Sequence, residues 1–279
     1  MLEIRNILVF LLILGLFLGA TVELSEGITF VGVFLFILLI VLISRVKFTG
    51  KAEKIRVLSV FHMQILGIAI ISADLIYNMR ISSSLGTLDM MTLLLGLSLI
   101  AQGIEKENIQ KMGIFGTYMS ITFIILFLVF FTLFNKFNIG FIHIFDHYVV
   151  LLPSVFVIRS LGVPIEVIEI ETVYMRGVEN MSVIIGGPCS GLYSMFLLVS
   201  TVVAYTRIEP IERRNILLLL GISVVIAYVA NLVRVTSLYI IGFYFGKDIM
   251  MTVHTHLGWM IFIVVIMLIF PVIKKFEGS

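Results

Sequence analysis

The stretch that decides the fold is Cys189-Ser-Gly-Leu-Tyr-Ser-Met-Phe-Leu-Leu-Val-Ser-Thr-Val-Val-Ala-Tyr-Thr206, which runs into Arg207-Ile-Glu-Pro-Ile-Glu-Arg-Arg214. An apolar run of this length fits a helix that crosses a membrane, which takes about 20 residues. The basic segment after it predicts a cytoplasmic loop, because short loops rich in lysine and arginine stay inside. Cys189, at the other end of the run, is therefore predicted to face the outside.

The composition of the whole chain agrees with a membrane protein. Of its 279 residues, 60% are hydrophobic and 13% are charged, and the mean hydropathy is +1.18. These values exclude a soluble domain with a single core and predict a multi-pass membrane protein. A net charge of +2 gives no basic cluster that would bind nucleic acid. The single cysteine excludes an internal disulfide and a cysteine-based metal site.

We expect an all-α polytopic membrane protein of about eight transmembrane helices, with both termini in the cytoplasm. Apolar runs and basic loops divide it into an N-terminal region of about five helices, residues 1–135, and a C-terminal region, residues 136–279. The expected spans are Asn6–Val22, Ile28–Ser44, Val57–Tyr77, Asp89–Ile104, Ile114–Phe134, Cys189–Thr206, a run from Asn215 that reaches the outer boundary at Arg234, and a last run from about His254 to before Lys274. A cleaved signal peptide is the alternative for the first run.

The segment between Asn135 and Pro188 breaks this pattern. Phe141–Leu161 is apolar but includes side chains that are expensive in lipid, which favours an interfacial or re-entrant helix over a span. These residues are His143, Asp146, His147, Pro153 and Arg159. Ile165–Glu171 and Asn180–Ile185 then flank Met175-Arg-Gly-Val178 and predict a β-hairpin. Because its edges are open, the hairpin must lie outside the bilayer or over a cavity lined by protein.

Cys189 follows a Gly-Gly-Pro break and opens a predicted helix. A helix N-terminus favours a thiolate over a thiol, because unpaired backbone N–H groups and the helix dipole point at it. A lone cysteine in an apolar protein can also be a small buried hydrophobic residue. The residues around Cys189 must therefore distinguish a reactive thiolate from a buried thiol. Counting residues along the last two spans brings Arg234 and His254 or His256 to the same outer face.

A cysteine, an arginine and a histidine at one depth are the groups that acyl transfer needs. Histidine can take a proton from the thiol and give it to a leaving amine, and a fixed guanidinium can stabilise a thiolate or an oxyanion. Taken alone, Arg234 could also be an arginine at a helix end that extends its side chain to the lipid headgroups. His62 and Asp74 are polar residues in an earlier span, and interfacial or helix-bonded side chains explain them, so we leave them out of the site.

Three blocks of the sequence resemble, in order and spacing, the signature blocks of the exosortase/archaeosortase family. They are Cys189-Ser-Gly-Leu192, Asn231-Leu-Val-Arg234-Val, and His254-Thr-His-Leu-Gly258-Trp259 with Phe262. The resemblance covers about Phe141 to Phe270, whereas residues 1–135 resemble the family only as generic spans. It implies a membrane cysteine transpeptidase, a type of cysteine peptidase, with sortase-like activity. Such an enzyme recognises secreted proteins by a C-terminal motif, transmembrane helix and basic tail, and cuts near the motif.

The same resemblance assigns roles to individual residues. The nucleophile, the anion stabiliser and the acid/base are, in that order, Cys189, Arg234 and His254. His254 fits the family spacing of histidine, three residues, glycine and tryptophan, and His256 is the alternative if the helix begins later. Asn231 is expected to orient the guanidinium, Ser190 to cap the following helix, and Gly191 to support them. This chemistry needs no metal ion and no organic cofactor.

The resemblance also implies partners and a location. The substrates are secreted proteins, and the acceptor of the new C-terminus is a lipid or another nucleophile at the outer face of the plasma membrane. The compact chain favours an archaeosortase, whose processed substrates are linked to lipid anchorage.

Other functions stay open from sequence. Hydrolysis by water would make the protein an intramembrane-type cysteine protease. A transporter, or an accessory factor for another membrane enzyme, would leave Cys189 dispensable.

Overall fold

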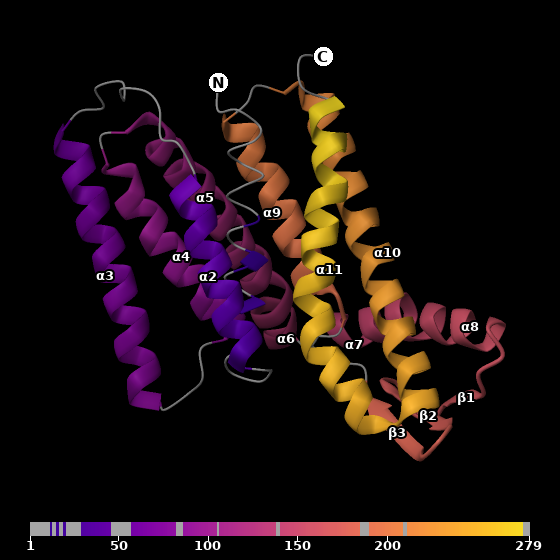
Figure 1. The fold of residues 1–279 in the computed structure, drawn as a ribbon. Coiled ribbons are helices and arrows are strands. Elements are labelled where there is room, and N and C mark those ends of the chain that lie inside the picture. The colour runs from indigo at the N-terminus through magenta and orange to yellow at the C-terminus, as the bar shows by residue number, and fades with distance from the viewer. Residues whose placement is uncertain are drawn as a thin grey trace.

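The computed structural model describes residues 12, 15, 16, 19, 20, 29–45, 57–81, 86–104, 106–137, 140–184, 190–208 and 211–275. The chain is mostly helical and has a small antiparallel sheet at one end of its helical bundle (Figure 1). Within the described residues, five helices are long and apolar enough to cross a membrane: Phe61–Ile81, Ile109–Leu133, Phe141–Ser160, Arg213–Phe245 and Lys247–Ile269. Two shorter apolar helices are Thr87–Gln102 and Leu192–Ile208. The predicted helical, multi-pass membrane fold is confirmed.

The N-terminal part of the bundle consists of helices that follow one another up and down. They are α2 (Thr29–Arg45), α3 (Val57–Ile81), α4 (Thr87–Gln102) and α5 (Glu107–Phe127), which continues through the π-helix η1 (Leu128–Leu133) into α6 (Phe134–Lys136). A Cβ added at Gly67 of α3 would lie 2.5 Å from the carbonyl oxygen of Gly96 in α4. Helices α3 and α4 therefore touch through their backbones, as small residues allow in membranes. The predicted span Asn6–Val22 lies largely outside the described residues.

The next helical segment runs across the bundle instead of along it. It comprises α7 (Phe141–Ile144), the π-helix η2 (Phe145–Leu151) and α8 (Leu152–Ser160). Figure 1 shows α8 nearly perpendicular to α9, α10 and α11. Length and composition alone would let this segment span a membrane, but its direction fits the predicted interfacial helix. We call α7, η2 and α8 together the crosswise helix.

The predicted hairpin is part of a sheet with three strands. These are β1 (Ile165–Val167), β2 (Thr172–Arg176) and β3 (Asn180–Ile184), in the order β1-β2-β3. The turn expected around Met175–Val178 lies between β2 and β3, with Arg176 paired to Asn180. The expected first strand Ile165–Glu171 is wrong in extent, because the chain turns back after Val167 and Met175 pairs with Ile165. The alternation of apolar and acidic residues continues through that turn and conceals it.

Three long helices complete the fold, and each differs from its predicted limits. They are α9 (Leu192–Ile208), α10 (Arg213–Phe245) and α11 (Lys247–Lys275). Helix α9 begins at Leu192, not at Cys189. Helix α10 has 33 residues, a length of about 50 Å, and continues well past Arg234. Helix α11 begins at Lys247, so His254 lies in its third turn rather than at its start.

Two separate hydrophobic cores explain the length of α10. The first, which we call the bundle core, joins α4, α5, α9, α10 and α11 through residues that include Met91, Phe115, Met119, Leu198, Ala227 and Val265. The second, which we call the sheet core, joins the crosswise helix, the sheet, the C-terminal part of α10 and the start of α11 through residues that include Leu151, Ile158, Val173, Met175, Leu238 and Met250. Helix α10 does not stop at Arg234, because its following turns pack in the sheet core.

Candidate active site

The polar residues of α10 lie where the two cores meet. On this helix, the bundle core ends with Ala227 and the sheet core begins with Val235. Asn231 and Arg234 occupy the turn between them, and Asn231 is only 5% exposed. A buried polar side chain is stable only if it finds partners, so this position marks a structural or functional requirement. The candidate site lies at the junction of the two cores.

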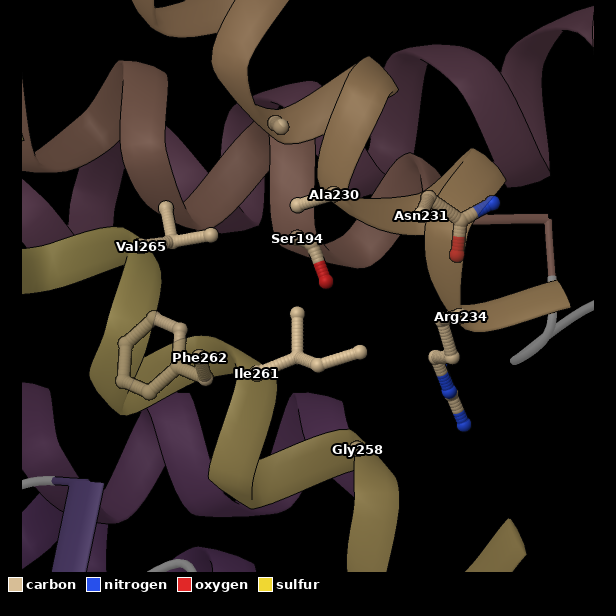
Figure 2. Close-up of a pocket in the computed structure, with 9 residues that line it drawn as sticks. Ser194, Ala230, Asn231, Arg234, Gly258, Ile261, Phe262 and Val265 are labelled. Carbon is tan, nitrogen blue, oxygen red and sulfur yellow. The ribbon is translucent and has the colours of Figure 1, made fainter. Parts of the chain in front are cut away.

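Arg234 reaches from α10 to the facing helix α11. A Cβ added at Gly258 would lie 3.4 Å from Nη2 and 3.6 Å from Cζ of Arg234. The guanidinium therefore lies against the backbone of α11 at Gly258, and Figure 2 shows the side chain pointing that way. At these distances an added Cβ would make ordinary van der Waals contact with the guanidinium, so the cation lies close beside α11 at this turn. A fixed guanidinium of this kind can hold a developing negative charge.

The residues that follow Cys189 are held against Asn231. Gly191 has φ +81°, a conformation that glycine adopts without strain. A Cβ added at Gly191 would lie 2.4 Å from Cγ of Asn231, well inside van der Waals contact. Ser190 has no exposed surface, and its hydroxyl oxygen accepts a hydrogen bond of 3.4 Å from the backbone N–H of Leu192 at the start of α9. The first turn of α9 is thus seated on α10.

A small pocket opens beside Arg234, between α9, α10 and α11 (Figure 2). The empty space at this opening, including the part that is open to the surroundings, is about 330 Å³. Asn231 and Arg234 lie at one end of the pocket, the Ser194 hydroxyl lies nearer its middle, and the other side chains of the wall are apolar. The lining residues are Ser194, Ala227, Ala230, Asn231, Arg234, Gly258, Ile261, Phe262 and Val265. Figure 2 shows the Ser194 hydroxyl facing Ile261 across the pocket.

The two candidate histidines lie on different faces of α11. Residues three or four apart share a helix face, so His254 belongs to the face of Gly258, Ile261 and Phe262, which lines the pocket. His256 belongs to the face of Trp259 and Ile263, and these two residues pack against Leu16, Ala20 and Leu35 of the N-terminal helices. Helix geometry therefore directs His254, and not His256, toward the arginine.

Cys189 itself lies outside the described residues. Its neighbour in the chain, Ser190, is described and lies with Gly191 at the junction of the cores. The structure thus brings together Ser190, Gly191, Asn231 and Arg234, with the face of α11 that carries His254 opposite them.

Asp146 is a buried acidic residue of the crosswise helix. From the sequence it stood out only as one of several polar residues that are expensive to place in lipid. It lies in the π-helix η2 and has no exposed surface. Its neighbour Phe145 packs against both the bundle core and the sheet core. A carboxylate that is completely buried is stable only with a charged or hydrogen-bonding partner, and π-helical turns often occur at functional sites. A π-helix has no recognisable sequence pattern. The only signal in the sequence that could have pointed to Asp146 is the presence of an acidic residue within an apolar run.

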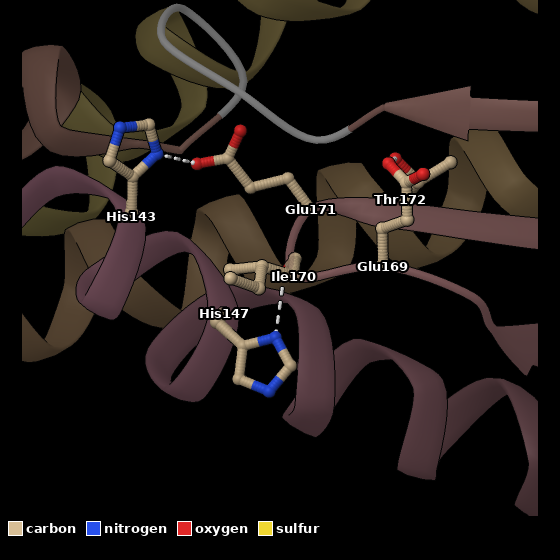
Figure 3. Close-up of polar contacts among 6 residues, drawn as sticks. All are labelled: His143, His147, Glu169, Ile170, Glu171 and Thr172. Atoms are coloured by element: carbon tan, nitrogen blue, oxygen red, sulfur yellow. Dashed lines mark hydrogen bonds and ion pairs between the residues drawn. The ribbon is translucent and has the colours of Figure 1, made fainter.

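Other polar residues of the crosswise helix have structural contacts away from the pocket. Figure 3 shows His143 paired with Glu171, and Nδ1 of His147 lies 2.6 Å from the carbonyl oxygen of Ile170. The hydroxyl of Thr172 donates to a carboxylate oxygen of Glu169 at 3.3 Å. The two histidine contacts tie the turn between β1 and β2 to the crosswise helix, and the Thr172 hydrogen bond lies within the turn. Among the described residues, no three His, Cys, Asp or Glu side chains are grouped so that they could hold a metal ion.

His62 and Asp74 both belong to α3. This helix lies at the edge of the bundle, on the side away from α10 and α11 (Figure 1). The placement agrees with leaving both residues out of the candidate site.

A comparison with protein families matches residues 28–271 to the family described as transmembrane exosortase (Exosortase_EpsH). The matched region begins far before Phe141, so the similarity includes the N-terminal helices that sequence inspection treated as generic spans. No curated protein matches the chain. No solved structure matches it either.

Proposed function

This chain belongs to the transmembrane exosortase family, and on that premise we propose that it is a cysteine transpeptidase with Cys189 as its nucleophile. Its substrates are secreted proteins that end in a short motif, a transmembrane helix and a basic tail. The enzyme cuts near the motif and transfers the new C-terminus to an acceptor. The observation that carries this proposal is the position of the Arg234 guanidinium, 3.4 Å from where a Cβ on Gly258 would lie and one helical turn from Asn231, against which Gly191 packs.

The reaction has two steps that share one acyl-enzyme. The Cys189 thiol gives its proton to His254, and the sulfur attacks the substrate carbonyl. The guanidinium of Arg234 stabilises the oxyanion, and the C–N bond breaks as His254 returns the proton to the leaving amine. An amine or hydroxyl acceptor then gives its proton to His254 and attacks the thioester. The new amide or ester leaves, and the proton returns to the sulfur.

Two features support His254 as the acid/base. It shares a face of α11 with Gly258, on which the Arg234 guanidinium lies. His256 shares its face with Trp259, which packs against Leu16 and Ala20. A group that transfers protons must come within hydrogen-bond reach of the sulfur and the leaving amine, and only the first face turns toward the pocket.

The supporting residues have positioning roles in this proposal. Asn231 holds the Gly191 turn on α10 and lies one turn before Arg234 on the same helix. Ser190 accepts a hydrogen bond from the first N–H of α9. Residues 136–279 form the catalytic region, and the helices of residues 1–135 brace it, since α5 shares the bundle core with α9.

We assign the site to the extracytoplasmic face of the plasma membrane. The loops that join α4 to α5 and α9 to α10 lie at the opposite end of the bundle and carry or adjoin basic residues, and short basic loops face the cytoplasm. These basic residues are Lys106, Lys111, Arg207, Arg213 and Arg214. We also favour the archaeosortase branch of the family and a lipid acceptor.

The test is to co-express a tagged secreted protein that carries such a C-terminal signal and to identify its mature C-terminus by mass spectrometry. We expect Cys189→Ala to abolish processing and Arg234→Ala to slow it by about 100-fold or more. His254→Ala should slow it by a similar factor, and His256→Ala only slightly. Each variant's amount in the membrane is measured as the control for insertion.

The product decides between transfer and hydrolysis. An added mass on the new C-terminus identifies the acceptor and supports transpeptidation. A free carboxylate would instead make the enzyme a protease. Normal processing by Cys189→Ala would refute the enzyme assignment and leave a transporter or an accessory factor.

A further inference from the structure

The sheet beside the candidate site has two edge strands with different properties. β2 is the central strand, with β1 on one side and β3 on the other. An edge strand presents unpaired backbone groups that readily pair with another chain, and proteins usually blunt such edges with short strands, charges or prolines. The β1 edge and the β3 edge differ in this protection.

The β1 edge is blunted. The strand has three residues, Ile165–Val167, and the side chain of its middle residue, Glu166, is exposed and charged. The carbonyl oxygen of Ile165 already accepts a hydrogen bond of 3.0 Å from Nε of Arg159. A further strand would have few backbone groups left to pair with on this side.

Among the residues that the structure describes, none protects the β3 edge in these ways. Its five residues, Asn180-Met-Ser-Val-Ile184, contain no charge and no proline. Asn180, Ser182 and Ile184 have exposed side chains, whereas Met181 is buried in the sheet core. Within the described part of the chain, β2 is the only strand that pairs with β3. An unprotected edge of this kind favours pairing with a separate polypeptide.

The edge leads directly to the proposed nucleophile. β3 ends at Ile184, five residues before Cys189, and a chain of that length spans at most about 18 Å. The turn before β3 is fixed at the far end of α10, where the N–H of Val178 donates to the carbonyl oxygen of Phe243 at 3.0 Å. Gly191, after the cysteine, contacts Asn231 about three turns back along the same helix. β3 therefore runs from the far end of the molecule toward the level of the site.

We propose that the substrate segment before the scissile bond binds in an extended conformation as a fourth strand, paired with the free edge of β3. This inference rests on the proposed function, because it identifies how that function's substrate is held. Backbone hydrogen bonds would supply affinity, and side chains on alternate positions would supply specificity.

The direction of the bound segment follows from the substrate's own order. Its transmembrane helix comes after the motif, so its chain runs from outside toward the membrane. β3 runs the same way, so the pairing is parallel. Alternate substrate side chains then lie beside the exposed row of Asn180 and Ser182, and those between them lie beside Met181 and Val183.

Disulfide mapping tests this pairing. The chain has a single cysteine, so Cys189→Ala provides a cysteine-free and inactive background. Ser182→Cys is added to it and co-expressed with the tagged secreted protein, which carries one cysteine at each position of its motif in turn. We expect disulfides at every second substrate position, several-fold more than at the positions between, because side chains alternate along a strand. Glu166→Cys on the β1 edge is the matched control and should form few disulfides with any position.

Processing of the same substrate set by the wild-type chain separates this inference from the proposed function. Disulfides with a period of two, together with processing, support both. If the substrate is processed but the disulfides show no period of two, or form equally well with Glu166→Cys, strand pairing is overturned. The transpeptidase assignment would then stand. Periodic disulfides without processing would support substrate docking on β3 and contradict the transpeptidase, and the failure of both would overturn both.

Discussion

Gly191 meets two constraints at once, and both act on the residues next to the cysteine. Its φ of +81° is strained for any residue with a side chain, and an added Cβ would meet Asn231 at 2.4 Å. We expect Gly191→Ala to lower the free energy of unfolding by at least about 1 kcal/mol. Substrate processing should fall as well, because the α9 turn would move off α10. Thermal unfolding in detergent and the processing assay measure the two effects.

Gly221 is the matched control for that substitution. It lies inside α10, and no heavy atom lies within 4 Å of an added Cβ. Alanine favours a helix interior over glycine by up to about 1 kcal/mol, so Gly221→Ala should leave stability unchanged or raise it. Equal losses in both variants would mean that the Gly191 contact has no special role.

Sequence spacing predicts which residue types gather at the site but not how they touch. Counting residues along the spans predicted Arg234 and His254 at one level, although it placed them at helix ends and both lie inside longer helices. It could not predict that Gly191 rests on Asn231 or that the guanidinium lies on Gly258, since these contacts depend on which helix faces meet. The buried carboxylate of Asp146 was missed as a candidate for the same reason.

Helix α10 shows why the limits of membrane helices are hard to predict. About 20 apolar residues cross the hydrocarbon core, so an arginine after that length suggests a helix end. The helix instead continues from Arg234 to Phe245, because Val235, Leu238 and Tyr239 pack in the sheet core. Hydropathy cannot separate residues that face lipid from residues that pack against a small sheet and a crosswise helix.

The start of α11 is fixed by the turn between β2 and β3. The backbone N–H of Lys247 donates to a carboxylate oxygen of Glu179, which satisfies one of the free donors at this helix N-terminus. We expect Glu179→Ala to lower the free energy of unfolding by about 1 kcal/mol, and Glu179→Gln to lower it less because an acceptor oxygen remains. Thermal unfolding of the purified variants measures the difference.

Glu212 provides the control for this cap. It occupies the N-cap position of α10 but its side chain makes no capping hydrogen bond. Glu212→Ala should therefore have little effect on stability. If it destabilised the chain as much as Glu179→Ala does, the hydrogen bond to Lys247 would not be what holds the start of α11.

The two ends of the whole molecule differ in structure. Figure 1 shows the turns between α4 and α5 and between α9 and α10, and the end of α11, at one end of the bundle, with the sheet at the other. The sequence predicted this arrangement well, because basic loops alternate with apolar runs. It did not predict that the sheet would have three strands and a core of its own, since that core is built from segments far apart in the chain.

Labelling of single cysteines tests this orientation in the Cys189→Ala background. Val178, in the turn between β2 and β3, is 73% exposed, and Glu212 is exposed at the opposite end. A membrane-impermeant maleimide added to intact cells should label Val178→Cys, and should label Glu212→Cys only after the membrane is opened. The reverse pattern would mean that the site faces the cytoplasm.

The role of Cys189 as the nucleophile is tested most directly by detecting an acyl-enzyme on this residue. Trypsin releases the cysteine in the peptide from Gly177 to Arg207, which has no internal lysine or arginine. After incubation of the purified protein with its substrate, we expect this peptide to carry the mass of the substrate's acyl fragment as a hydroxylamine-sensitive thioester. The adduct should be absent in Cys189→Ala. Continued processing by Cys189→Ala, without any adduct on this peptide in the wild type, would contradict the central claim.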